Sequence, residues 1–455
     1  MASSGMLLRN ASVAGVGRSD ILINDGRISA IGDDPPAAGA EVIDAAGGAA
    51  LPGLHDHHCH LLAMAAARRS VVCGPPETTT GEQLSAVLRA AHLTGGWVRG
   101  VGYHESVAGD LDCHVLDRAR SDVPTRVQHR GGSLWVLNSA GLAEVGLDAP
   151  AMGEPSGIDR DAEGRPTGRL WRCDAWLRDR LDPAPPPDLG AVSAELAAYG
   201  ITGVTDATPD LDTGALALLR SPSFRQRLTL LGESDSSAPR KILVSDHSLP
   251  SLDALVELVG GCRPRAVAVH CVTRVALVLT VAALRQVGTV RGDRIEHAAV
   301  VPPDLVLAMA GLGVTVVTQP SLPGLRGDRY LEDAETDDRE YLWPFASLLA
   351  AGVPVGCSSD APYGSPDPWF AIRAASARRT GSGRAVAPLE KVSAGAALRG
   401  YLTDPLDPGG PVRQVAVGTC ADLLVLDAPL DDVLATPDAG HVRFTLVGGE
   451  VIHRG

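Results

Sequence analysis

Histidine and aspartate residues that suit a metal ion stand at the ends of several short apolar runs. The first run ends in His55-Asp-His-His-Cys-His60, and later runs end at His270, His297 and Asp360. Side chains at positions i and i+2 of a strand share a face, so two of these histidines can point into one cavity, with backbones roughly 6–7 Å apart. Imidazole and carboxylate without convergent thiolates suit zinc, iron, nickel or manganese better than calcium or magnesium. The pattern predicts a catalytic metal site in a βα barrel.

The histidine cluster leaves two registers open. His55 and His57 share one face of a strand, and His58 and His60 share the other face. Periodicity alone does not choose between them. Cys59 lies between two of these histidines, and strand alternation points its thiol away from the second pair, so we do not expect it to bind metal.

Strand-like apolar runs alternate with helical periodicity through the middle of the chain. This alternation predicts a parallel sheet with right-handed crossovers, and eight such strands can close into a barrel. Nine candidates compete for the eight places, and sequence does not decide which of 228–231 and 241–244 falls outside. The candidates are 54–60, 125–128, 203–206, 228–231, 241–244, 266–270, 294–297, 314–319 and 353–357. Barrel active sites form at the carboxyl ends of strands, so polar residues there should meet.

The sequence pattern at both ends of the chain is typical of short strands joined by tight turns. We predict that residues 1–52 and 400–455 build one small composite β-sandwich, with the barrel inserted as residues 53–399. Segment 62–190 is too long for one crossover. It is interpreted as an insertion at the barrel mouth, where substrate-facing loops sit.

Composition excludes several classes of partner. A formal net charge of −14 disfavours nucleic acid and anionic membrane, because both demand a basic surface. No apolar run approaches ~18 residues, so no transmembrane helix is expected. The eight cysteines are scattered without a CxxC pair, as in a reduced cytoplasmic protein, and the N-terminus has no signal-peptide pattern. A small-molecule substrate is the expected partner.

Several motifs support a resemblance to a known family. They are Leu51-Pro-Gly-Leu-His-Asp-His-His-Cys-His60, Gly200-Ile-Thr-Gly-Val-Thr-Asp-Ala207, Arg294-Ile-Glu-His-Ala298, Gln319-Pro, Ser358-Ser-Asp-Ala-Pro362 and Val417-Gly-Thr-Cys-Ala-Asp422. Together they resemble the amidohydrolase superfamily, and within it the amidohydrolase 3 branch of N-substituted formamide deformylase-like enzymes. The first motif is similar to the superfamily signature of Pro-Gly, two residues, Asp, one residue and His-x-His. That alignment selects His58 and His60.

The resemblance implies a distorted (β/α)8 TIM barrel holding one or two divalent ions, with zinc as the expected metal. The implied ligands are His58, His60, Lys241, His270, His297 and Asp360. Lys241 is one of only two lysines among 40 basic residues, and carboxylation would turn it into a bridging carboxylate. The competing interpretation is a solvent-exposed lysine at a strand start. Asp360 is expected to take the proton from the attacking water and pass it to the leaving nitrogen, with His297 as the second catalytic residue.

Four further residues carry weaker predictions. Ser133 stands where many members of the branch have a histidine, and His129 precedes it in an insertion that could face the substrate. Trp369 could line an apolar pocket, although core packing explains it as well. Asp206, at a strand end, could orient a ligand histidine or cap a helix.

The predicted activity is metal-dependent hydrolysis of a non-peptide C–N bond in a small amide, formamide or cyclic amide. One alternative is a mononuclear zinc deaminase of a heterocyclic amine. Such enzymes usually carry a glutamate base shortly after the strand-5 histidine, and His270-Cys-Val-Thr has none. The other alternative is a catalytically inactive barrel that acts as a scaffold. Relatives make a homodimer the expected assembly.

Overall fold

The chain has a mixed α/β fold that divides into two compact units. The computed structural model describes residues 5–147, 154–181, 187–232, 236–244 and 249–455. The first unit comprises Met1–Leu61 and Leu189–Gly455, and the second is Leu62–Asp188. In the part of the chain that the structure describes, no helix combines the length and apolar content needed to cross a bilayer.

Eight parallel strands of the first unit form two sheets, in the orders β14-β13-β6 and β15-β16-β17-β18-β19. Their bounds are β6 Leu54–Cys59, β13 Ile201–Asp206, β14 Arg227–Leu230, β15 Arg240–Leu243, β16 Val267–Cys271, β17 Arg294–His297, β18 Thr315–Thr318 and β19 Val355–Cys357. A few backbone bonds link the two sheets: Lys241 N to Leu231 O on one side, and Asp360 N to His58 O and His60 N to Ala361 O on the other, all 2.8 Å. Among the described residues the ladders themselves leave two separate sheets, so strand pairing alone does not establish a closed barrel.

The ninth strand candidate lies outside this parallel set. Residues 125–128 belong to β9 (Thr125–His129), which pairs with strands of the second unit. Both 228–231 and 241–244 supply parallel strands, β14 and β15. The prediction that one of these two falls outside was therefore wrong. A short strand of an inserted sheet has the same apolar pattern as a strand of the main sheet, so periodicity could not tell the two kinds of strand apart.

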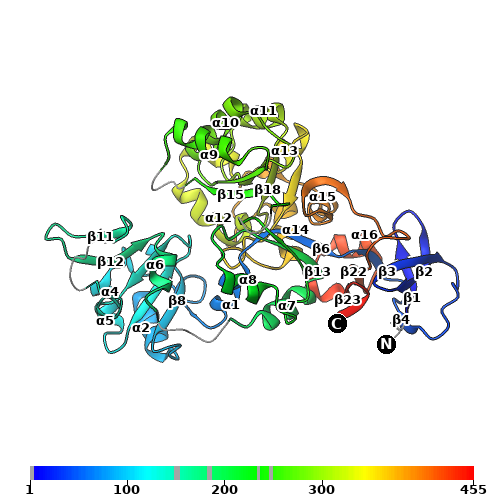
Figure 1. Cartoon of the computed structure of the whole chain (residues 1–455), viewed down its shortest axis with the longest axis horizontal. Helices are drawn as coiled ribbons and strands as arrows, with labels where there is room; N and C mark the ends of the chain where they lie inside the picture. Colours follow the sequence, from blue (N-terminus) through cyan, green and yellow to red (C-terminus); the bar gives the residue numbers. More distant parts are fainter. Residues whose placement is uncertain (1–4, 148–153, 182–186, 233–235, 245–248) are drawn as a thin grey trace. The chain divides into compact units, whose positions relative to one another are not determined.

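Helices of the first unit follow the parallel strands, and α9 and α10 begin at capping side chains. Ser251 Oγ accepts from Ala254 N at the start of α9 (Leu252–Cys262), and Thr273 Oγ1 accepts from Ala276 N at the start of α10 (Arg274–Val287), both at 3.2 Å. Figure 1 shows α9, α10 and α11 (Pro303–Leu312) grouped beside β15 and β18. The remaining α-helices that lie wholly in this unit are α7 Leu189–Ala198, α8 Thr213–Leu219, α12 Leu322–Asp333, α13 Ala346–Ala350, α14 Pro368–Ala377, α15 Ala394–Arg399 and α16 Leu430–Ala435.

The two ends of the chain build a common sheet of eight strands, in the order β24-β23-β22-β5-β1-β2-β3 with β4 paired to β1. The strands are β1 Met6–Val13, β2 Gly17–Asn24, β3 Arg27–Gly32, β4 Glu41–Asp44, β5 Ala49–Pro52, β22 Leu423–Leu426, β23 Val442–Val447 and β24 Glu450–Arg454. The C-terminal β22 pairs antiparallel with the N-terminal β5, and apolar side chains from both ends share one core. Strand pairing connects these strands into one sheet, and it does not confirm the predicted two-layered sandwich.

The second unit has a sheet of its own, with the order β11-β12-β10-β9-β8-β7. Its strands are β7 Val71–Val72, β8 Val98–Tyr103, β9 Thr125–His129, β10 Leu134–Leu137, β11 Ile158–Arg160 and β12 Pro166–Trp171. The helices are α1 Leu61–Ala67, which begins at the boundary, then α2 Gly81–Ala90, α3 Glu105–Ala108, α4 Cys113–Ala119, α5 Ser139–Glu144 and α6 Asp174–Arg178. Buried Leu88, Val98 and Val127 form part of its core. Its position at the barrel mouth stays a prediction.

Candidate metal centre

Strand ends of the first unit bring the six predicted ligands into one cluster. His58 lies near the end of β6 and His60 follows it, His270 lies near the end of β16, and His297 ends β17. Asp360 comes three residues after β19. The carboxyl ends of neighbouring parallel strands lie at the same edge, which is why residues far apart in the chain meet here.

Lys241 reaches the cluster from deeper in its strand. It pairs with Ala268, whereas His270 pairs with Leu243, so the lysine backbone lies two residues nearer the amino end. This offset is roughly 6–7 Å, which the four-carbon lysine side chain can span. Lys241 is 7% exposed and its Nζ lies 3.4 Å from His58 Nε2. The interpretation of Lys241 as a solvent-exposed residue is therefore wrong.

Asp360 lies among three of the histidines. Its Oδ1 is 3.7 Å from His58 Nε2 and 3.5 Å from His60 Nε2, and its Oδ2 is 3.9 Å from His297 Nδ1. One ligand atom each from His58, His60 and Asp360 falls within a mutual distance of 4.8 Å. His270 joins through its Nδ1, 2.8 Å from His297 Nε2. Two imidazoles and a carboxylate at this spacing fit a divalent transition-metal ion.

Three of the imidazoles are anchored through Nδ1. His58 Nδ1 bonds to the Glu296 carboxylate. His60 Nδ1 lies 3.1 Å from Thr208 Oγ1, and His297 Nδ1 lies 2.9 Å from Gln319 Oε1. Partners of this kind fix the orientation of a ligand histidine and leave the other nitrogen for the metal.

Burial keeps His58, His270 and His297 neutral, which is the form that binds metal. Burial, reinforced by the positive charge of Lys241, lowers the pKa of His58 to about 3. Burial also lowers the pKa of His270 and of His297. Burial likewise lowers the pKa of Lys241 to about 8. Although burial opposes it, the hydrogen bond with His60 lowers the pKa of Asp360, so that carboxylate is ionised.

Backbone geometry at the site departs from regular strands. His297 has φ of 71° and Asp360 has φ of 54°, and non-glycine residues rarely adopt such values. Strand alternation would place Glu296 and His297 on opposite faces. Because His297 turns out of the extended conformation, both side chains reach the same cluster.

A buried carboxylate ties β6 to the segment that carries Asp360. Asp56 Oδ1 accepts from His58 N at 3.1 Å and from Ser359 N at 3.0 Å, and its Oδ2 accepts from Ser359 Oγ. Burial raises the pKa of Asp56 to about 6. These bonds fix the spacing between His58 and Asp360.

Sequence reasoning missed the residues that hold the ligands: Asp56, Thr208, Glu296 and Gln319. Three of them stood inside quoted motifs, as the aspartate of the first motif, the glutamate before His297 and the glutamine before a proline. Asp206, which was expected to orient a histidine or cap a helix, accepts from Leu61 N at 2.8 Å and from Thr208 N at 2.9 Å. It therefore caps the start of α1.

The weaker substrate-contact predictions gain no support from the described contacts. Trp369 is completely buried and its indole nitrogen donates to Tyr199 O at 3.1 Å, as a core residue does. His129 and Ser133 lie in the second unit, where His129 Nε2 is 3.3 Å from Glu105. As expected, Cys59 points away from the cluster and donates to Thr205 O at 3.7 Å.

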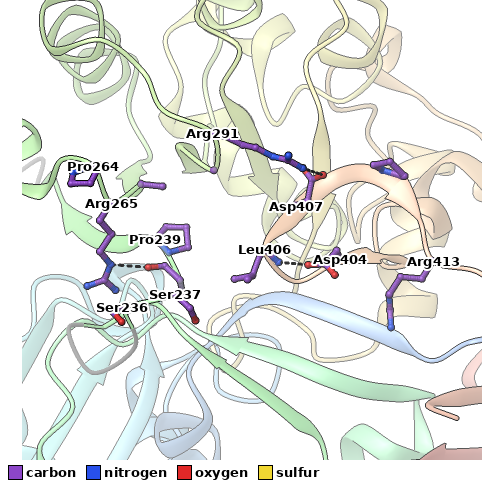
Figure 2. Close-up of a pocket in the computed structure, with 14 residues that line it drawn as sticks. Ser236, Ser237, Pro239, Pro264, Arg265, Arg291, Asp404, Leu406, Asp407 and Arg413 are labelled. Atoms are coloured by element: carbon purple, nitrogen blue, oxygen red, sulfur yellow. Dashed lines mark hydrogen bonds and ion pairs between the residues drawn. The ribbon is translucent and has the colours of Figure 1, made fainter. Parts of the chain in front are cut away.

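A cavity of about 760 Å³ lies at the opposite, amino ends of the strands. Figure 2 shows that it is lined by the residues before β15, β16 and β17, including Pro239 and Arg265, and by Asp404, Asp407 and Arg413. Arg265 and Arg413 are already bonded to backbone carbonyl groups, and Arg291 reaches Asp407 at 3.5 Å. The metal-type ligands are not part of this cavity.

Comparison with known proteins identifies the class. Residues 41–229 and 250–453 match the amidohydrolase family. The chain is 29% identical to N-substituted formamide deformylase from Arthrobacter pascens, over 90% of each chain. The chain therefore belongs to the amidohydrolase family.

Two solved structures share the fold. An uncharacterized metal-dependent hydrolase from Pyrococcus horikoshii OT3 aligns with a TM-score of 0.73 and 18% identity, covering 96% of this chain and 100% of that one. An uncharacterized metal-dependent hydrolase from Pyrococcus furiosus aligns with a TM-score of 0.68 and 19% identity, covering 93% and 99%. At this level of identity the likeness concerns the fold alone.

Proposed function

We propose that this protein hydrolyses a non-peptide C–N bond of a small molecule, with N-substituted formamides and related amides as the substrate class. The observation that carries the proposal is the convergence of His58, His60, Lys241, His270, His297 and Asp360 at one set of strand ends. The formamide preference is supported by the 29% identity to the Arthrobacter pascens enzyme over 90% of both chains. We further propose that the eight parallel strands form a distorted barrel around this site.

The donor set fits one or two divalent ions, with zinc the best match to imidazole and carboxylate. His58, His60 and Asp360 would hold one ion, and His270 and His297 a second, with a carboxylated Lys241 between them. When bound, such an ion supplies Lewis acidity to the substrate carbonyl and lowers the pKa of water to about 7.

The chain's own residues supply the remaining chemistry. Asp360 is ionised and its side chain is 14% exposed, so an attacking water can give its proton to a carboxylate oxygen. The same carboxylate then donates that proton to the nitrogen as the C–N bond breaks, which regenerates its charged form. His58, His270 and His297 stay neutral through the cycle and hold the geometry.

Metal stoichiometry tests the proposal. We expect about two divalent ions per chain in protein purified without chelator, and one or none after Lys241→Ala. The matched control is Lys391→Ala, which removes the other lysine, an exposed one, and should leave the metal content unchanged.

A panel of N-substituted formamides and amides, with formate or carboxylate release as the readout, follows on the metal-loaded protein. Release of ammonia from heterocyclic amines without amide hydrolysis would favour the deaminase alternative. Absence of bound metal even after zinc is supplied would overturn the hydrolase proposal and favour a scaffold.

A further inference from the structure

Glu296 is a buried carboxylate that meets one donor on each oxygen. It is 0% exposed, its Oε2 accepts from His58 Nδ1 and its Oε1 accepts from Arg294 Nε. Arg294 is itself buried, and its Nη2 donates to His57 O at 2.8 Å. We propose that Glu296, held by Arg294, is a positioning residue that fixes the His58 tautomer presenting Nε2 to the metal, and so sets the metal affinity of the site. The inference rests on the proposed metal-dependent function.

The position of one proton determines which nitrogen of His58 can bind the metal. Glu296 Oε1 accepts from Arg294 Nε and Oε2 meets His58 Nδ1, so both carboxylate oxygens act as acceptors and the imidazole proton lies on Nδ1. Its Nε2 then carries the lone pair, and this atom faces Lys241 Nζ at 3.4 Å and Asp360 Oδ1 at 3.7 Å. A metal ion needs that lone pair. Glu296 therefore holds the ring in the form that binds.

Glu296 determines the tautomer more firmly than the partner of His60 does. Thr208 contacts His60 through a hydroxyl, which can donate or accept and therefore accommodates either tautomer. Gln319 offers His297 an acceptor of the same kind as Glu296 does, because its amide nitrogen donates to Ser358 Oγ at 2.9 Å and leaves the amide oxygen facing the ring. The Glu296 oxygen that meets His58 acts as an acceptor, and the other oxygen accepts from Arg294. The negative charge of Glu296 also raises the basicity of the ligand nitrogen.

Glu296→Gln separates this role from packing, because glutamine has nearly the same shape but only one acceptor oxygen. Arg294 cannot give up its proton and retains its need for an acceptor. The amide oxygen then faces Arg294 and the amide N–H₂ faces His58, which must move its proton to Nε2. We expect zinc affinity to fall by about 10- to 100-fold, the usual effect of losing such a partner.

The measurement is zinc affinity by competition with a chromophoric chelator, on the full chain. A second readout is the tautomer in metal-free protein labelled with ¹⁵N in the imidazole rings. In the wild type the His58 Nδ1 resonance should be that of a protonated nitrogen, and in Glu296→Gln the two nitrogens should exchange roles. A purely structural carboxylate would not produce this exchange.

Asp293→Asn is the matched control. Asp293 immediately precedes β17, is 2% exposed and pairs with Arg263 at 2.7 Å, yet it lies at the end of the strand away from the cluster. Loss of the full ion pair lowers the stability of this variant, and its folded fraction should bind zinc like the wild type.

The outcomes are distinguishable. A wild type that binds no zinc contradicts the proposed function itself. Normal affinity in Glu296→Gln, or an equal loss in Asp293→Asn, overturns the positioning role while the metal site stands. If Glu296→Gln does not fold, Glu296→Asp replaces it: the shorter carboxylate withdraws from His58 and affinity should fall about tenfold. Unchanged affinity in that variant also overturns the inference.

Discussion

Replacing Asp293 by alanine should strongly destabilise the first unit without touching its metal ligands. The carboxylate accepts from Arg263 Nη1 and Nη2 at 2.9 and 2.7 Å, and from the backbone nitrogens of Val267 and Val290, each at 2.9 Å. These bonds join the amino ends of β16 and β17. The carboxyl ends of the same two strands carry His270 and His297.

The expected loss in the free energy of unfolding follows from the hydrogen-bond donors that Asp293→Ala leaves without an acceptor. Val267 is fully buried, and an unsatisfied buried N–H costs about 1–3 kcal/mol. Loss of one partner of a buried ion pair costs about 3–5 kcal/mol in total, because the remaining charge is uncompensated. The Arg263 side chain is only 16% exposed, so water replaces little of the loss. We expect the free energy of unfolding to fall by about 4 kcal/mol.

The assay is urea unfolding followed by circular dichroism. At a slope of about 3 kcal/mol/M, the expected loss moves the midpoint by roughly 1.3 M. Glu41→Ala is the control: its pair with Arg454 is 2.9 Å long, but both side chains are 56% exposed, so less than about 1 kcal/mol is expected. A shift for Asp293→Ala no larger than for Glu41→Ala would refute the reasoning.

Three further predictions concern the site and its surroundings. Asp360→Asn should lower kcat about 10²- to 10⁴-fold while the urea midpoint stays within a few tenths of a molar, as steady-state kinetics and unfolding would show. Gly203→Ala should lower the free energy of unfolding by about 1–3 kcal/mol, because its Cβ would lie 2.5 Å from His55 Nδ1. Gly311→Ala has open space around its Cβ and should raise that free energy by about 0.5–1 kcal/mol. Equal urea midpoints for the two variants would contradict this. Of the eight free cysteines only Cys420 is exposed, so a thiol reagent should label one group in native protein and eight in urea.

Much of the fold was predictable because its signals are local. The parallel strands were recognisable from apolar runs, and the helices from their periodicity. Strand membership in a particular sheet was not predictable, because pairing depends on partners distant in sequence. The 125–128 run showed this, since nothing within it distinguishes β9 from the parallel strands.

Some residues of the site could likewise be predicted from local sequence, and others only from tertiary contacts. Ligand types and their strand-end positions are local features, so the sequence already suggested His270, His297 and Asp360. The residues that orient them depend on three-dimensional contacts: Glu296 meets a histidine 238 positions away. Its role also required a break in strand alternation at His297 that no periodicity encodes. The cytoplasmic location and the homodimer stay predictions.

The contacts of β6 decide which of its two histidine pairs faces the metal cluster, a choice that periodicity left open. His55 Nε2 lies 2.9 Å from Thr205 Oγ1, and His57 Nε2 lies 3.0 Å from Thr403 Oγ1. Burial holds the pKa of both imidazoles well below its usual value. Each is therefore a neutral side chain bonded to a hydroxyl, on a face that β13 and Thr403 of β20 (Thr403–Asp404) cover. The other face meets Asp360 and Lys241, so the neighbours of the strand, and not its own alternation, determine which pair of histidines is available to a metal ion.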